Sequence, residues 1–291
     1  MYGGQAVIEG VMIRGLKCCA LAVRRPDGTI AKHILPLLPW SNGKSRKIPF
    51  IRGLVVLSET MIIGMKALSI SSAESVGEVF EKKQNIVGTV ITLSIAFVFA
   101  ICLFFLLPVF ISEIVNRNLA NEFLANVVEG LIRLFFFIGY IWLIGRMKEI
   151  QRVFGYHGAE HMTVHAVESG DTLSIEKIRT YPPQHPRCGT SFLLTVVLVS
   201  ILLFIVIPRD PFWFLIISRI VLIPVIAGIS YEFIRFTGSH TENEIVKYVG
   251  YPNIWLQNLT TRQPEDSMIQ VAIEAMNHVR LMDSQEKNPS G

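Results

Sequence analysis

Three histidines within residues 155–165 are the side chains best suited to chemistry, because they recur in steps of four: His157, His161 and His165. On a helix this spacing places the three imidazoles on one face. Neutral imidazole is the commonest metal ligand in proteins, and helical zinc hydrolases use two histidines four apart with a glutamate beside the second, as Glu160 is here. The segment therefore predicts a metal site. A solvent-facing histidine stripe is the alternative.

Two more candidate ligands, His185 and Cys188, follow the histidine segment along the chain. They stand three residues apart in the run YPPQHPRCGT, at the end of a polar loop. Three prolines stiffen the chain around them and so fix the position of both side chains. Nitrogens from His157, His161 and His185, with the sulfur of Cys188, would complete a tetrahedral set that suits zinc. A closed set of four ligands is more typical of a structural site than of a catalytic one.

Glu160 decides whether such a site is catalytic. If only three of the four ligands bind, a position stays open for water, and Glu160 is the expected general base or acid, since a metal lowers the pKa of bound water toward ~7. Glu160 is alternatively a ligand beside His157, because side chains three apart converge on a helix. His165 and Glu232 are weaker metal candidates; for Glu232, an ion pair with Arg235 one turn later is the alternative.

The composition places the chain among membrane proteins. Hydrophobic residues make up 51% of the sequence and the mean hydropathy is +0.46, which is too apolar for an ordinary soluble domain. Residues 86–110 carry no charge and are long enough to cross ~30 Å of hydrocarbon. Further apolar stretches lie at 123–144, 191–207 and 212–236. We expect an α-helical integral membrane protein with about four transmembrane helices.

The distribution of basic residues predicts the orientation. Lysines and arginines are dense before residue 86 and again over 146–187, whereas the segments at 111–122 and 208–211 carry few. The positive-inside rule then places both termini and the loop 146–190 in the cytoplasm of a multi-pass protein of the bacterial inner membrane. The opening residues predict no cleavable signal peptide, and cytoplasmic cysteines predict no disulfide framework. The basic residues are explained by topology and membrane lipids, so no nucleic-acid partner is expected.

The polar parts of the chain predict three regions: a cytoplasmic subdomain at 1–84, the membrane region at 85–237, and a cytoplasmic segment at 238–291. The first region is expected to be a small α+β unit, with a β-hairpin of strands 18–24 and 29–35 around a Pro-Asp-Gly turn. The glycine-rich opening, 3–15, is read as a close-packed turn or strand rather than a ligand-binding loop.

Amphipathic helices are predicted on either side of the membrane region. Residues 49–71 have helical periodicity but are interrupted by charges, so we expect an interfacial or re-entrant helix that is too short to span. Residues 264–282 form a second amphipathic helix, whose apolar stripe is Met268, Val271, Ala272, Ala275, Met276 and Val279. Residues 239–261 read as mixed loop and short helix, and 285–291 as a disordered tail.

Three ionisable residues fall inside the predicted spans: Glu129, Arg133 and Arg219. Such residues usually face the bundle interior and pair with one another. An ion pair of Glu129 with Arg133 or Arg219 that fastens helices together is favoured over a substrate pathway.

The opening GGQAVIEGVM, the motif YHGAEH at 156–161 and the run HPRCGTSF at 185–192 together resemble the YqhQ-like bacterial membrane proteins. The resemblance extends over nearly the whole chain. It implies an inner-membrane protein, labelled a predicted metal-dependent enzyme, with its metal site at His157, Glu160, His161, His185 and Cys188.

These observations favour a zinc-dependent hydrolase that acts on a lipid-linked or membrane-proximal substrate. A membrane di-iron hydroxylase fits less well, because such enzymes carry a large histidine set with adjacent pairs, whereas this chain has 7 histidines and no adjacent pair. The rival from another class is a non-catalytic scaffold or assembly factor whose metal is structural and whose partner is a membrane protein of the insertion or secretion machinery.

Overall fold

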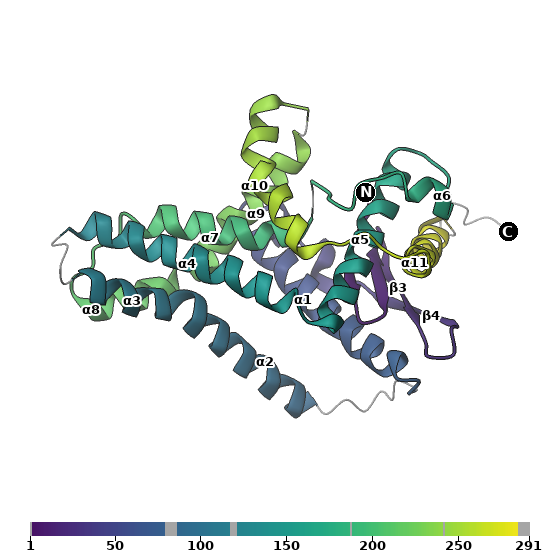
Figure 1. Ribbon diagram of the computed structural model, residues 1–291, viewed down its shortest axis with the longest axis horizontal. Helices are drawn as coiled ribbons and strands as arrows, with labels where there is room; N and C mark the ends of the chain where they lie inside the picture. Colours follow the sequence, from purple (N-terminus) through teal and green to yellow (C-terminus); the bar gives the residue numbers. More distant parts are fainter. Residues whose placement is uncertain (1, 79–85, 117–120, 187, 241, 285–291) are drawn as a thin grey trace.

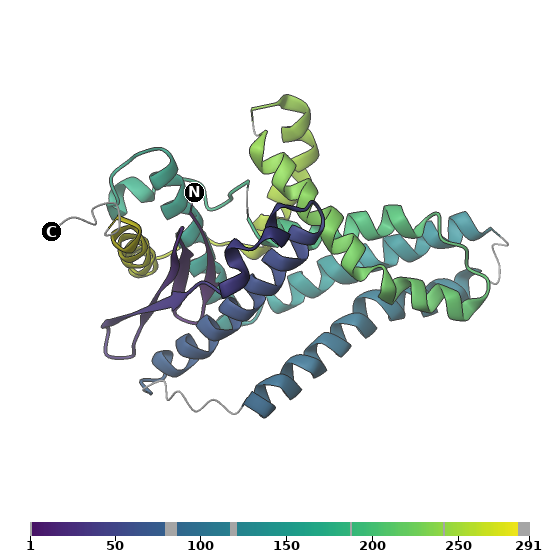
Figure 2. The ribbon, with the colours of Figure 1, turned by 180° about the vertical axis from the view of Figure 1, so that it is seen from behind.

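The computed structural model describes residues 2–78, 86–116, 121–186, 188–240 and 242–284, and it is mostly helical. Figure 1 shows an elongated molecule with a body of long helices at one end and a small sheet covered by helices at the other. The first strands and the last helix both lie at the sheet end, as the view from behind in Figure 2 also shows. The N-terminal and C-terminal regions therefore form one unit, although they are far apart in sequence.

The sheet has four antiparallel strands in sequence order: β1 (Gly3–Val7), β2 (Gly10–Arg14), β3 (Cys18–Arg24) and β4 (Ile30–Pro36). The predicted hairpin is confirmed, with a turn in which the Gly28 N–H donates to the Arg25 carbonyl at 3.0 Å. Gly28 has a φ of +86°, a conformation that favours glycine. The glycine-rich opening forms β1 and β2, so its interpretation as a strand is confirmed.

Both faces of the sheet are buried, because alternate residues of each strand point to opposite sides. One face packs on α1 (Ile51–Ser75) through Met12, Cys19, Leu21, Ile63, Ala67 and Ile70. The other packs on α5 (Lys148–Glu168) and α11 (Asp266–Ser284), with a core that includes Val11, Ile13, Ala20, Met162, Val271 and Ala275. The sheet is thus the middle layer between α1 and the helix that carries the histidines.

Helix α1 corrects one prediction. It is continuous over 25 residues and is long and apolar enough to cross a membrane, so the expectation of a helix too short to span is wrong for its length and composition. The prediction took Arg52 and Lys66, with Glu59 between them, to leave too few residues for a span. Glu59 is in fact fully buried against the sheet and accepts a bond from Arg14 at 2.9 Å, with Arg46 at 3.6 Å.

The helical body contains two of the predicted spans as expected. The first runs from α2 (Ile86–Ile101) through a π-helical turn (Cys102–Leu106) into α3 (Leu107–Asn116), and α4 (Glu122–Ile144) is the second. The other two differ from prediction: α7 (Thr190–Phe204) has only 15 residues, and α8 (Phe212–Val221) meets α9 (Ile223–Ser239) at a bend of 44°. Pro224 in the first turn of α9 lacks an N–H and so favours the break. Within the described residues, three helices could span a membrane, or four if the bent pair is one span.

The C-terminal region holds one surprise. Residues Glu244–Thr260 form a full helix, α10, so the expectation of mixed loop is wrong; Asn243 caps it by accepting from the Ile245 and Val246 N–H groups. Figure 1 shows α10 standing crosswise to the long axis of the helical body. The amphipathic helix expected at 264–282 is confirmed as α11, and every residue of its predicted stripe is buried. The predicted tail at 285–291 lies outside the described residues.

Three short helices complete the described chain, α6 (Ile175–Ile178) and two 3₁₀ turns at Pro39–Asn42 and Lys44–Lys47. They connect the layers at the sheet end. The polar loop that follows α6 carries the proline-rich run and leads into α7.

A buried ion cluster joins the helices of the body. Glu129 of α4 accepts from Arg133 at 2.8 Å and from Arg219 of α8 at 2.8 Å, so the predicted pairing is confirmed. The sequence prediction missed a third guanidinium, Arg209, at 3.1 Å. The π-helical turn also takes part, since the Phe104 carbonyl accepts from Arg133 Nε at 2.9 Å. All four charged side chains are almost fully buried, which makes this cluster the polar core of the bundle.

Glu129→Gln is expected to destabilise the protein, because it removes the negative charge that three buried guanidinium groups share. Breaking a buried pair costs on the order of 3–5 kcal/mol. Thermal unfolding in detergent would measure the change. The matched control is Glu244→Gln, which removes an exposed pair with Lys247 and is expected to change Tm little. Equal Tm values for the two variants would contradict a stabilising role for the cluster.

Candidate metal centre

The three predicted histidines lie on one helix, as expected, and their rings follow one another along α5. The ring centroids of His157 and His161 are 4.3 Å apart. The face that carries them turns toward the proline-rich loop and the end of α10, and His161 is only 3% exposed. The solvent-facing stripe is therefore ruled out for His161.

Each of the three imidazoles has one nitrogen bonded to a main-chain carbonyl from outside α5. His157 Nδ1 donates to Thr260 at 2.8 Å, His161 Nδ1 to Pro183 at 2.6 Å and His165 Nε2 to Gln184 at 2.8 Å. A carbonyl only accepts, so these nitrogens carry the hydrogen and the other nitrogen of each ring keeps a lone pair. Metal-binding histidines in proteins are oriented by the same kind of bond.

His157, His161 and Cys188 form the first ligand group, with one donor atom of each within 4.8 Å of the others. Cys188 Sγ lies 3.2 Å from His157 Nε2 and accepts from the Thr190 N–H at 3.3 Å. The cysteine is free and buried. The set combines two imidazole nitrogens with one sulfur, donors that suit zinc, and leaves room in a tetrahedral shell for a fourth ligand.

Glu160 lies beside this group. Its Oε2 is 3.7 Å from His161 Nε2, and its side chain is only 5% exposed. Burial raises the pKa of Glu160 to about 7, while the charge of His157 and a bond from the Gly4 main chain act in the opposite direction. Strand β1 approaches so closely that a Cβ at Gly4 would lie 2.8 Å from Glu160 Cγ. The glycine-rich opening thus closes over the carboxylate.

His185 joins a different group from the one predicted. Its donor atom lies within 4.8 Å of those of His165 and Glu168. Burial lowers the pKa of His185 to about 4, with His165 adding to the effect, so its imidazole is neutral at physiological pH. The predicted four-ligand set is thus divided between two neighbouring groups. Sequence reasoning missed Glu168, although its i, i+3 spacing from His165 could have indicated it.

Glu232 belongs to neither group. It lies on α9 and pairs with Arg52 of α1, with Arg52 Nε 2.7 Å from Oε1, so the alternative that paired Glu232 with Arg235 is wrong. The side chain of Arg52 comes from 180 residues earlier in the chain, which is why a local pairing rule did not find it. Arg52 and the Phe50 N–H hold Glu232 away from the histidines.

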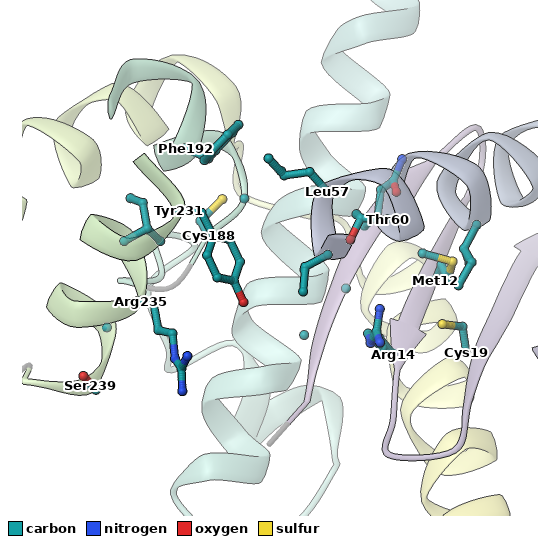
Figure 3. A pocket seen from close by; sticks show the side chains of 18 residues that line it. Met12, Arg14, Cys19, Leu57, Thr60, Cys188, Phe192, Tyr231, Arg235 and Ser239 are labelled. Carbon is teal, nitrogen blue, oxygen red and sulfur yellow. The ribbon is translucent and has the colours of Figure 1, made fainter. Parts of the chain in front are cut away.

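A cavity of about 600 Å³ lies next to the first ligand group, between the sheet, α1 and α9. Cys188 and Gly4 both form part of its wall. Figure 3 shows the two sides of the cavity, with Cys188, Phe192, Tyr231 and Arg235 across from Met12, Arg14 and Cys19. Most of the lining is apolar; of its two arginines, Arg14 is paired with Glu59, and Arg235 supplies positive charge. The cavity could not be predicted from the sequence, because its walls come from segments more than 230 residues apart, from Gly3 to Ser239.

Comparisons with known proteins show which family the chain resembles. A family model described as "Protein of unknown function (DUF1385)" matches residues 48–281, more than half of the chain. The protein named "Uncharacterized protein YqhQ" from Bacillus subtilis (strain 168) is 35% identical over 307 aligned residues, which cover 99% of this chain and 96% of that protein. No solved structure matches the chain.

Gly158→Ala is expected to disturb the candidate metal centre, because Gly158 faces the same two segments that contact the histidines. The new Cβ would lie 2.1 Å from the Arg262 carbonyl oxygen, so the segment that supplies the Thr260 carbonyl to His157 would have to move. Overpacking of this kind costs on the order of 1–3 kcal/mol. A lower Tm and less bound metal by elemental analysis are expected. The control is Gly139→Ala in α4, where nothing lies within 4 Å of the new Cβ; an equal loss in both variants would contradict this packing.

Proposed function

The chain belongs to the DUF1385 family, and from this premise we propose that it is a zinc-dependent enzyme of the bacterial inner membrane that hydrolyses a lipid-linked or membrane-proximal substrate at the cytoplasmic face. The observation that carries the proposal is the arrangement of His157, His161 and Cys188 beside the Glu160 carboxylate, at the wall of an apolar cavity. The membrane setting, the metal and the reaction are argued in turn below.

Exposed apolar side chains support a membrane setting. Along α2, Phe97 and Phe99 are 59% and 60% exposed, and only 11% of the span's apolar window is buried. A soluble protein rarely leaves so large an apolar surface in water. Helix α10 adds a second surface, with exposed Ile245, Tyr248, Tyr251 and Trp255 on a helix crosswise to the bundle (Figure 1). Tyr and Trp favour the membrane–water interface, so we place α10 in the inner interface as an amphipathic interfacial helix.

The donor chemistry of the first group supports zinc. Two imidazoles and a thiol are borderline-soft ligands, and each ring already has its second nitrogen fixed by a carbonyl. A zinc ion bound there with an open fourth position would lower the pKa of a bound water toward ~7. Three protein ligands with one open position is the arrangement of catalytic rather than structural zinc sites.

Glu160 would act as the general base. Its Oε2 lies 3.7 Å from His161 Nε2 and therefore faces the place where a reacting water would sit. The carboxylate would accept the proton of that water and later return it to the leaving group. The Gly4 main-chain bond holds the carboxyl group in position, and the surrounding sheet and helices exclude bulk water from it.

The cavity supports an amphiphilic substrate. Its apolar wall, which includes Ile63, Phe192 and Ile234, suits a hydrocarbon chain, and the exposed Arg235 suits an acidic headgroup. Because Cys188 belongs to both the cavity wall and the ligand group, a bound chain would bring its polar end next to the metal centre.

A non-catalytic scaffold is the second candidate, and one observation favours it. The first group joins α5 at the sheet end to the residue that leads into α7 of the helical body, so a metal there would fasten the two ends of the molecule together. In that case the metal would support assembly with a membrane-protein partner. A stoichiometric partner that co-purifies with the chain, together with no turnover of any lipid, would favour this reading.

Metal analysis tests the first group directly. Detergent-purified wild type is expected to contain zinc, and His161→Ala and Cys188→Ala are each expected to lose the zinc of this group, because each removes a ligand. His240→Ala, which changes an exposed histidine at the end of α9, is the control and should keep the full zinc content. Unchanged zinc in both ligand variants would overturn the proposal.

Glu160→Gln separates catalysis from metal binding. The variant keeps the ligands, so its zinc content should equal that of the wild type, while hydrolysis should fall by about 10²-fold or more. Products formed from vesicles of total bacterial lipid would be followed by mass spectrometry. Equal turnover in the variant and the wild type would remove Glu160 from the reaction; no turnover in either would favour the scaffold.

Leu57→Trp tests the cavity. The larger side chain would fill space on the α1 wall, so lipid affinity is expected to fall at least about tenfold. Leu54→Trp is the matched control, since Leu54 lies on the same helix, is 37% exposed and does not line the cavity. Phospholipid retained per chain after detergent purification gives the readout, and equal retention by the two variants would contradict a lipid site here.

A further inference from the structure

We propose that His165, Glu168 and His185 form a second divalent-metal site, next to but separate from the group of His157, His161 and Cys188. The inference goes beyond the proposed function, because this second site uses residues that do not belong to the first ligand group. Two imidazoles and one carboxylate bind divalent zinc, manganese or iron in many proteins.

The geometry of the three side chains supports a shared ligand. One donor atom of each lies within 4.8 Å of the other two. His185 Nε2 and Glu168 Oε2 are 3.2 Å apart, and the rings of His165 and His185 have centroids 4.5 Å apart. His165 and Glu168 are three residues apart in α5, a spacing that brings their side chains together on the helix surface. A hydrogen bond between Glu168 and His185 explains why these two side chains meet, but it does not explain why His165 also converges on them.

His165 is oriented as a ligand would be. Its Nε2 donates to the Gln184 carbonyl at 2.8 Å, which leaves Nδ1 with the lone pair. The Tyr181 ring is stacked on the imidazole, with centroids 5.8 Å apart and planes 7° from parallel, and so limits rotation of the ring. Both partners belong to the proline-rich loop, so the loop fixes the tautomer and the plane of this histidine.

The main chain of His185 is held by the side chain of Gln257. Gln257 of α10 is fully buried; its Oε1 accepts from the His185 N–H at 2.8 Å, and its Nε2 donates to the His185 carbonyl at 2.9 Å. The N–H and the carbonyl of His185 are thus both hydrogen-bonded to the side-chain amide of Gln257. Fixing a residue in this way is how proteins pre-position a ligand before the metal binds.

The two sites are neighbours along α5. The ring centroids of His161 and His185 are 5.6 Å apart, so the histidines of both groups form one continuous row of neighbouring, mutually tilted imidazoles. They differ in donor chemistry, because the first group contains a thiol and the second contains only nitrogen and oxygen donors. This difference makes them distinguishable by spectroscopy.

Titration of metal-free, full-length protein in detergent with Co²⁺ alone tests the inference. Wild type is expected to bind about two Co²⁺ per chain, only one of which gives a thiolate-to-cobalt charge-transfer band. Glu168→Gln keeps a hydrogen-bonding amide beside His185 but is a poor ligand, so it should bind about one Co²⁺ and keep the full band. Cys188→Ser should lose the band and still bind cobalt in the second site.

The control is Glu176→Gln, an exposed glutamate in the first turn of α6, which should bind as much cobalt as the wild type. Thermal unfolding of each variant without metal would verify that it is folded. Binding of about one Co²⁺ by the wild type that Glu168→Gln leaves unchanged would overturn the second site. A wild type that shows no charge-transfer band but binds cobalt in a Glu168-dependent way would instead refute the first site and retain this one.

Discussion

The arrangement of the histidines on α5 depends on main-chain carbonyls that α5 itself cannot supply. Inside a helix the carbonyls are used by the N–H groups four residues later, so the acceptors for three imidazoles must come from elsewhere. Thr260 is the last residue of α10, where carbonyls lack helical partners, and Pro183 and Gln184 lie in a loop outside any helix. The imidazole N–H groups thereby satisfy the hydrogen-bonding needs of these carbonyls, and the carbonyls fix the tautomer and orientation of each imidazole. The absence of a side chain at Gly158 is what lets the segment after α10 approach so closely.

The molecule holds buried polar groups in two ways. In the helical body, Glu129 is surrounded by guanidinium groups, Glu113 also pairs with Arg209, and the Phe204 ring lies 4.8 Å from Arg133 and 4.3 Å from Arg219, so these charged groups are held by one another and by an aromatic ring. At the sheet end the imidazoles, the thiol and Glu160 converge, with one wall of the group facing a cavity. The first arrangement stabilises helix contacts. The second keeps donor atoms available to a ligand.

Sequence reasoning succeeded where the physical rule is local. Four-residue spacing predicted the histidine face of α5, a Pro-Asp-Gly turn between two strand-like segments predicted the β3–β4 hairpin, and an apolar stripe predicted α11. It failed where tertiary contacts determine the partner of a side chain or the extent of a helix. The partner of Glu232 comes from α1, burial of Glu59 by the sheet lets α1 continue, and exposed aromatic residues on α10 gave no core pattern. The division of the ligands into two groups also depends on where Gln257 holds the loop.

Helix α10 links an exposed aromatic surface of the protein to the histidines. The helix carries exposed tyrosine and tryptophan side chains, and its last carbonyl is the acceptor for His157. A hydrogen bond weakens steeply when its atoms separate by a few tenths of an ångström or tilt from line. Helix α10 therefore connects the outside of the protein, through its exposed aromatic side chains, to an imidazole ring, through its last carbonyl. A small displacement of α10 would therefore change the hydrogen bond that sets the tautomer and the orientation of the His157 ring.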